Sequence, residues 1–138
     1  MERGMMDLAT LFGSLQILRR GEWISTVNQQ IPDDVAVLAT AYELEGITRI
    51  IDASYASTLD LDNEPVFTCL TLNIHSALES VGLTKTVSST LADAGINCNA
   101  IAGFYHDHLL VPVARANQAE QLLNTLKGSY APSGGWSW

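Results

Sequence analysis

The sequence predicts an α+β protein in which helices cover one face of an antiparallel sheet. Residues 66–127 follow the order strand, helix, strand, strand, helix, which is the split βαβ arrangement of ferredoxin-like folds. Only Tyr105-His106 separates the last two strands, so they are expected to pair antiparallel. Residues 66–74 alternate between an apolar face and a mixed one, which is typical of an antiparallel sheet covered on one side.

The first 65 residues give less regular patterns. A helical stripe is followed by Arg19, Arg20 and Gly21, which suit a helix end, and Asp7 suits its start. The residues of the stripe are Leu8, Leu11, Phe12, Leu15 and Leu18. Residues 22–28 are rich in β-branched and aromatic residues and predict a strand.

A turn at residues 31–34 precedes residues 35–52, which we interpret as a β-hairpin turning at Glu45-Gly46. A helix over the Ala- and Leu-containing first part of that segment is the alternative. Residues 53–61 predict a short helix or an irregular segment, and residues 60–65 a polar linker.

The second half has clearer element boundaries. The helix at 80–94 has Gly95 as its stop, and the helix at 116–127 is followed by Gly128. The strands are expected at 66–74, 96–104 and 107–113. Pro112 near the end of the last strand suits an edge or terminal position.

Composition and charge restrict the class of protein. Of 138 residues, 47% are hydrophobic and 16% charged, and the net charge is −8, which is typical of a globular domain. The seven Lys and Arg residues are scattered, so neither nucleic acid nor an anionic membrane is expected as a partner. The sequence has no secretion signal and no apolar run of about 18 residues, so we expect a cytoplasmic protein. Cys69 and Cys98 lack metal-site spacing and are interpreted as reduced core thiols, with a disulfide or metal pair as the alternative.

The segment GFYHDHLLV is the main candidate for chemistry. His106 and His108, spaced i and i+2, would share one face of a strand and with His75 could bind a metal. A polar hairpin turn explains the same residues and is the favoured interpretation. No nucleophile elbow surrounds Ser76, and no phosphate loop or dinucleotide motif is present. The acidic residues at 60–64 fit a solvated linker better than a cation site. We therefore expect no enzyme activity, metal or cofactor.

The strand-to-helix connection is a second candidate. Ser76 and Glu79 have the spacing of a capping box, and Gly82 would allow close approach of a ligand or a neighbouring element. Free N–H groups at a helix start suit a carboxylate. An ordinary connection with tight packing at Gly82 is the alternative, and spacing alone favours it.

The run TLNIHSALESVGLTKTVSSTLADAGINCNAIAGFYHDHLLVPV resembles ACT domains, the small ligand-sensing modules of amino-acid metabolism. More narrowly, it is similar to an ACT-like family of small bacterial proteins. The resemblance covers residues 66 to about 127 well, and residues 22–51, including ELEGIT, more loosely. It implies a tandem: a degenerate ACT-like unit at 1–65, an ACT-like unit at 66–128 and a flexible tail at 129–138. It also implies a relation to the regulatory regions of aspartate kinases and to cytosolic arginine sensors.

The resemblance further implies a function and a site. A non-catalytic regulatory protein is expected to bind an amino acid between ACT-like units and to form a homo-oligomer, such as a dimer. The implied ligand-binding residues are His75, Ser76, Val81, Gly82, Leu83, Asn97, Asn99, Ile101, His106, Asp107 and His108. The alternatives are a protein–protein assembly module with a vestigial ligand site and a metal-dependent enzyme based on the three histidines.

Overall fold

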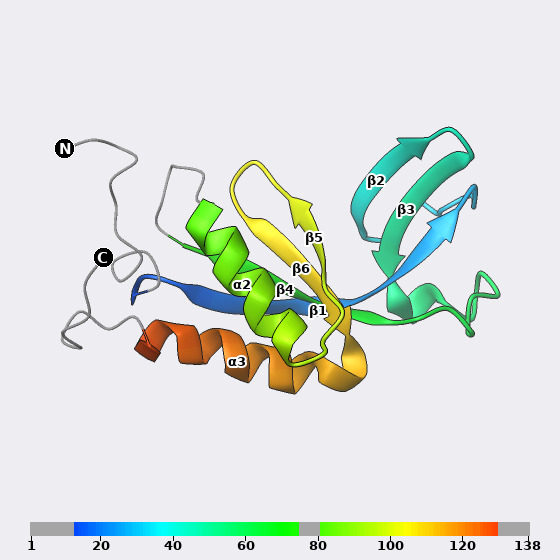
Figure 1. Cartoon of the computed structure of the whole chain (residues 1–138). Helices are drawn as coiled ribbons and strands as arrows, with labels where there is room; N and C mark the ends of the chain where they lie inside the picture. The colour runs from blue at the N-terminus through cyan, green and yellow to red at the C-terminus, as the bar shows by residue number, and fades with distance from the viewer. Residues whose placement is uncertain (1–12, 75–80, 130–138) are drawn as a thin grey trace.

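The computed structural model describes residues 13–74 and 81–129, with backbone alone at residues 81, 82, 128 and 129. Within these ranges the strands form one antiparallel six-stranded sheet in the order β2-β3-β1-β4-β6-β5 (Figure 1). The strands are β1 (Gln16–Val27), β2 (Val37–Glu43), β3 (Gly46–Asp52), β4 (Phe67–Asn73), β5 (Asn99–Ala102) and β6 (Asp107–Pro112). The helices are α2 (Val81–Asp93) and α3 (Ala116–Ser129), with 3-10 turns η2 (Ala53–Tyr55) and η3 (Val113–Arg115). The predicted α+β fold is confirmed.

The second half has the predicted order β4-α2-β5-β6-α3. Gly95, with φ of 72°, follows α2 in the left-handed conformation expected of a C-terminal stop. Two boundaries differ clearly from the prediction: β5 begins only at Asn99, and α3 continues through Gly128. β6 lies inside the sheet, so of the two positions predicted for Pro112 the terminal one is correct. Pro112 is tolerated in β6 because it is the last residue of the strand.

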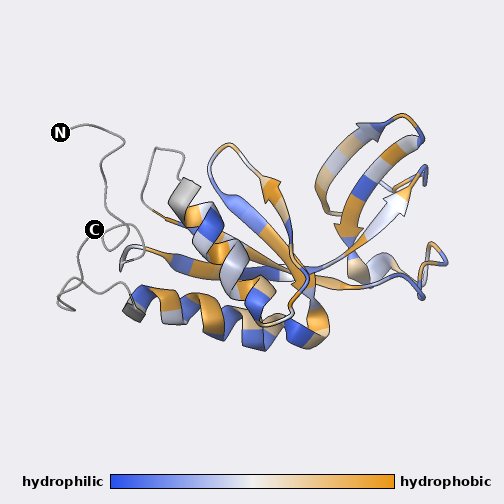
Figure 2. Cartoon of the chain, viewed as in Figure 1, coloured by the Kyte–Doolittle hydropathy of each residue, from blue (hydrophilic) through white to orange (hydrophobic). Residues whose placement is uncertain are grey.

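The main core lies between α2, α3 and one face of the sheet. Hydrophobic residues alternate with hydrophilic ones along both helices (Figure 2). The sheet contributes Leu70 and Leu72 from β4 and Leu109 and Val111 from β6, and the helices contribute Leu83, Val87, Leu91, Ala119 and Leu123. Fully burying one such Leu or Val contributes about 1.5–3 kcal/mol, so this face supplies much of the folding free energy.

The helix predicted through Leu15, Leu18 and Arg20 is wrong, because β1 begins at Gln16; residues 1–12 lie outside the described ranges. Residues 16–19 pair with β4 from Asn73 to Leu70. This pairing satisfies the backbone N–H and C=O groups of the segment with hydrogen bonds, and the Leu15 side chain is buried in the main core. Leu18 points to the opposite face and is 42% exposed. Tertiary pairing therefore overrides a locally helical pattern.

The sequence had suggested that Gly21 ends a helix. In the structure Gly21 lies within β1. The pairing with β4 shifts between Arg19 and Glu22, where three steps along β1 match two along β4, so an extra residue forms a β-bulge. Gly21 has a φ of 83°, and the Trp23 indole Nε1 donates to the Arg20 carbonyl at 2.7 Å. The second half of β1, Trp23–Val27, pairs with β3.

The predicted hairpin is confirmed, since β2 and β3 are antiparallel, which rules out the alternative helix. Its turn lies at Leu44-Glu45, one residue before the predicted Glu45-Gly46, because Gly46 already belongs to β3. A second core of Ile24, Val35 and Ile51 lies under the hairpin. Side chains of the segment after β3, including Tyr55 and Leu59, pack against it. The turn η2 fits the short helical or irregular segment expected there.

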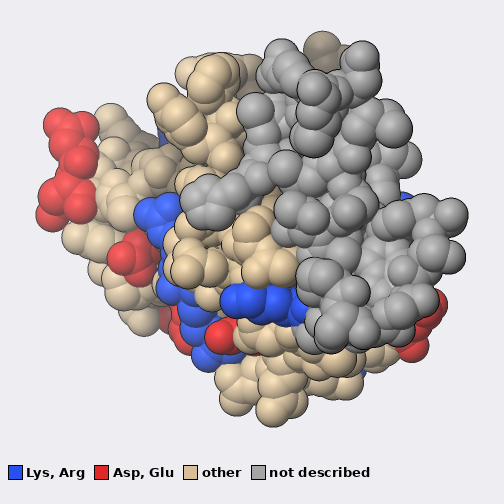
Figure 3. Space-filling model, turned by 90° about the vertical axis from the view of Figure 1, so that its left-hand side faces the viewer, with Lys and Arg blue, Asp and Glu red and all other residues tan. Residues whose placement is uncertain are grey.

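Charged side chains of both signs are mixed on the face shown in Figure 3. One ion pair joins the two layers of the fold: Arg19 Nε on β1 lies 3.2 Å from Glu120 Oε1 on α3. Of the helices in the described parts of the chain, none is long and apolar enough to span a membrane.

Candidate functional site

Of the candidates that the structure describes, three begin α2 (Val81, Gly82 and Leu83), Asn97 lies between α2 and β5, and the others lie on the β5–β6 hairpin. His75 and Ser76 lie outside the described residues, and of Val81 and Gly82 only the backbone is described, as the first two residues of α2. The Leu83 side chain is 7% exposed and packs in the main core. It therefore supports the start of α2 from beneath and does not line an open cleft.

The two faces of the sheet divide the remaining candidates. Ile101 of β5 and His108 of β6 are cross-strand neighbours, and Asn99 lies two residues before Ile101 on the same face. This face is opposite to the one that carries Leu109, which packs with Leu83 of α2 in the main core. Asp107 pairs with Leu72 and therefore faces the helices. Asn97 precedes β5 and is exposed. The structure thus groups Ile101 with His108, and it separates this pair from Leu83.

His108 is the best-connected candidate. Its Nδ1 lies 2.8 Å from the Thr71 hydroxyl oxygen, across the β4–β6 pairing. The same hydroxyl lies 3.7 Å from the Cys69 sulfur, and both Thr71 and Cys69 are fully buried. Sequence reasoning missed Thr71 because its partner depends on the register of two strands that are distant in the chain. Its only signal was a Thr on the mixed face of an alternating strand.

Burial lowers the pKa of His108, the nearby Arg20 and His106 side chains lower it further, and Asp107 raises it. At neutral pH the imidazole is therefore uncharged and has one donor and one acceptor nitrogen. Burial also raises the pKa of the Cys69 and Cys98 thiols, which stay protonated and poorly nucleophilic. This group is suited to recognition by hydrogen bonds rather than to nucleophilic attack.

The turn between β5 and β6 consists of residues 103–106, closed by the Gly103 N–H donating to the His106 carbonyl at 2.9 Å. A Cβ on Gly103 would lie 2.6 Å from that carbonyl oxygen and 3.1 Å from His108 Nε2, so glycine allows the close contact. Phe104 and Tyr105 project outward, 95% and 83% exposed. His106 Nδ1 is buried and has no hydrogen-bond partner in the described part of the chain.

His106 lies in this turn, before β6 begins, so the two histidines do not share a strand. Within residues 13–74 and 81–129, no three His, Cys, Asp or Glu side chains are grouped so that they could hold a metal ion. His75, the third predicted ligand, is outside these ranges.

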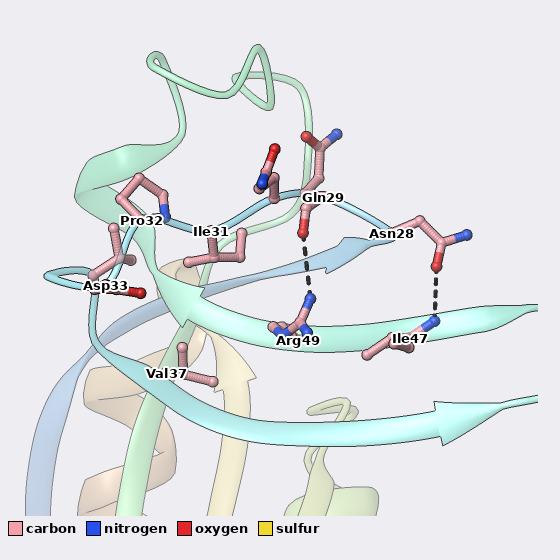
Figure 4. Close-up of a pocket in the computed structure, with 10 residues that line it drawn as sticks. Asn28, Gln29, Ile31, Pro32, Asp33, Val37, Ile47 and Arg49 are labelled. Carbon is pink, nitrogen blue, oxygen red and sulfur yellow. Dashed lines mark hydrogen bonds between the residues drawn. The ribbon is translucent and has the colours of Figure 1, made fainter.

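A groove on the hairpin side of the molecule was not predicted. The segment from Asn28 to Val35 crosses the face of β2 and β3 and borders an open groove of about 600 Å³ (Figure 4). Asn28 holds the segment to β3, since its backbone N–H donates to the Ile47 carbonyl and its Oδ1 accepts from the Ile47 N–H, both at 2.9 Å. The Arg49 guanidinium donates to the Gln29 carbonyl at 3.3 Å. Asn28 has a φ of 54°, a left-handed conformation that Asn tolerates. The sequence signals for this loop were this Asn and the turn predicted at residues 31–34.

Comparison with known proteins identifies the family. The sequence profile of the ACT domain matches residues 66–125. A Vibrio cholerae protein of unknown function, described as a possible transport protein, is 33% identical, with a TM-score of 0.75 over 90% of this chain and 98% of that one. No curated protein matches the sequence significantly.

More distant structures share the fold. An Agobacterium tumefaciens protein is 19% identical, with a TM-score of 0.54 over 82% of this chain and 87% of that one. A structure of aspartokinase alpha and beta subunits is 11% identical, with a TM-score of 0.58 over 81% of this chain and 97% of that one. An allosteric aspartate kinase of Clostridium acetobutylicum is 7% identical, with a TM-score of 0.58 over 83% of this chain and 34% of that one. ACT domains are regulatory domains that bind small molecules. The chain belongs to the ACT-domain superfamily, and residues 66–125 are its ACT domain.

Proposed function

We propose that the protein is a non-catalytic, cytoplasmic sensor that binds an amino acid beside β5 and the β5–β6 turn. The observation that supports this most is the His108 imidazole, uncharged and hydrogen-bonded to Thr71, on the sheet face opposite the helices. A half-buried neutral imidazole next to Ile101 offers one polar and one apolar contact to a ligand side chain.

The other predicted residues have complementary roles in this proposal. Backbone N–H groups at the start of α2, at Val81 and Gly82, bind the ligand carboxylate with help from His75 and Ser76. Asn97 and Asn99 bind the remaining polar groups of the ligand, and both are exposed. His106 and Asp107 border the site from the turn.

A second ACT-like unit completes the site in this proposal. β5 is an edge strand, so one side of its backbone is unpaired within the described sheet. A second copy aligned at this edge would bring its own groups beside Asn99 and Ile101, in a homodimer. Residues 1–65 act as the degenerate unit of the tandem and residues 66–128 as the sensing unit; the tail expected at 129–138 lies outside the described residues from residue 130 onward.

Thermal shift with the twenty amino acids at millimolar concentration tests the proposal. A ligand at about 100 times its Kd stabilises the native state by ~2.7 kcal/mol, which raises Tm measurably. Asn99→Ala should reduce that shift, and Asn63→Ala, a matched change at an exposed linker position, should leave it intact. If no amino acid raises Tm, the sensor proposal fails, and the assembly alternative then predicts an oligomer that depends on protein concentration alone.

A further inference from the structure

We propose that the groove between residues 28–35 and the β2–β3 hairpin binds a small aliphatic carboxylate. The groove is remote from the ACT domain in sequence and does not depend on the sensor function proposed above. Its volume of about 600 Å³ falls within the ~300–1,000 Å³ typical of small-molecule sites.

Arg49 provides the positive charge at this site. It projects from β3 into the groove and is the only Lys or Arg among the residues that line it (Figure 4). In the described part of the chain the Arg49 guanidinium has a single hydrogen bond, to the Gln29 carbonyl at 3.3 Å, and no carboxylate partner. A guanidinium has five N–H donors in a planar fork that matches a carboxylate, so several donors are available to a ligand.

Apart from Arg49, the groove is lined by both polar and apolar side chains, and its apolar part suits a short hydrocarbon chain. Val35 is 5% exposed and belongs to the second core, whereas Val37 is 43% exposed at the groove surface. The apolar side chains of the lining are Ile31, Pro32, Val35, Val37 and Ile47. A ligand with its carboxylate on Arg49 would cover Val37 and Ile47 and remove apolar area from water.

Hydrogen bonds hold the groove in shape before a ligand arrives. Both Asn28 contacts with Ile47 fix one end of the crossing segment. At the other end the Val35 N–H donates to the Pro32 carbonyl at 3.1 Å, and the Asp52 N–H donates to the Ala36 carbonyl at 3.1 Å. A site fixed in this way loses little conformational entropy on binding.

Charge limits the ligand to a monoanion. Asp33 also lines the groove, and the chain carries a net charge of −8. A dianion such as phosphate would be attracted by Arg49 alone and repelled by Asp33 and by the net negative charge of the chain. A monocarboxylate balances Arg49 alone. Asp33 is exposed and lowers the affinity for any anion, so its removal should strengthen binding.

The test is a titration of the ¹⁵N-labelled protein with valerate, followed by amide chemical shifts. Amides of residues 28–31, 33–37 and 47–49 should shift saturably, and valeramide, which has the same shape without the charge, should not shift them. Arg49→Gln should weaken valerate binding by about tenfold or more, the loss expected for a charged hydrogen-bonded pair. Lys85→Gln, an equal change in net charge at an exposed position on α2, should leave binding unchanged.

Two further variants keep the test decisive if Arg49→Gln loosens the crossing segment. Asp33→Asn should strengthen valerate binding, and Val37→Glu should abolish it while Arg49 remains in place. The proposal is overturned if valerate shifts no groove amide, if valeramide binds equally well, or if Lys85→Gln weakens binding as much as Arg49→Gln. Asn99→Ala should not affect valerate, so failure of this site and failure of the sensor site give different results.

Discussion

Replacing Gly103 by Ala should destabilise the protein by about 1–3 kcal/mol, the usual cost of forcing an extra methyl group into a packed position. The added Cβ would lie 2.6 Å from the His106 carbonyl oxygen and 3.1 Å from His108 Nε2. The first distance is too short for any Cβ contact, and the oxygen belongs to the backbone that closes the turn. The turn must therefore open, which weakens the 2.9 Å bond from the Gly103 N–H.

Urea unfolding measures the loss, with Gly13→Ala as the control. Nothing lies within 4 Å of a Cβ at Gly13, and its φ is not positive, so that variant should change the free energy of unfolding by no more than ~0.5 kcal/mol. Gly95→Ala gives a second comparison: it meets no neighbour, but its φ of 72° should cost about 1–2 kcal/mol through the backbone alone.

A double-mutant cycle with His108→Ala separates the two contacts of the new methyl group. Because the carbonyl contact is the shorter, most of the cost of Gly103→Ala should persist when the imidazole is absent. A cost that disappears in the His108→Ala background would refute this reasoning and show that the imidazole, not the turn backbone, requires glycine.

Three further predictions concern the site and its support. Because folding lowers the pKa of His108, its contribution to stability is fully present above the unfolded pKa of about 6.5 and is lost as the pH falls from there through the folded pKa. His108→Asn should therefore flatten the dependence of the free energy of unfolding on pH, measured by urea unfolding, by at most ~1.4 kcal/mol per pH unit. Arg115 Nη2 donates to the Ala94 carbonyl after α2 at 2.9 Å, so Arg115→Leu should cost about 1–2 kcal/mol, and Arg115→Lys less. Leu70→Ala in the core should cost about 2–5 kcal/mol, whereas Leu18→Ala at a 42% exposed position should cost much less, and equal losses would contradict the assigned faces.

The fold of the ACT domain could be predicted because each of its elements carries a local signal. The alternation of residues 66–74, the apolar stripe of α2 and the Gly95 stop agree with one another, and the short turn leaves β5 and β6 a single way to pair. The same agreement explains why the quoted motif was sufficient to indicate the family.

The candidate site was harder to predict from the sequence because it depends on the register between neighbouring strands. Thr71 and His108 are partners only because β4 and β6 align at that position, and nothing within either strand specifies the alignment. The groove around Arg49 depends in the same way on a segment that folds back across the hairpin. Sequence patterns describe which residues share a face of one element, and they do not describe which element lies opposite.

The β-bulge at Gly21 explains both the failed helix prediction and the way the two cores are joined. Ile17 packs against the main core and Ile24 lies in the second, seven positions later, so on a regular strand they would face opposite sides. The extra residue of the bulge brings both side chains to the same face of the sheet. Ile17 pairs with Leu72 and Glu22 with Thr68, which share one face of β4, and Ile24 lies two residues after Glu22. Only a residue that tolerates a φ of 83° fits there, and Gly21 therefore lets one strand supply apolar side chains to both cores. Because β1 pairs with β4 on both sides of the bulge and its second half, Trp23–Val27, also pairs with β3, the hairpin and the ACT domain are held in a single sheet.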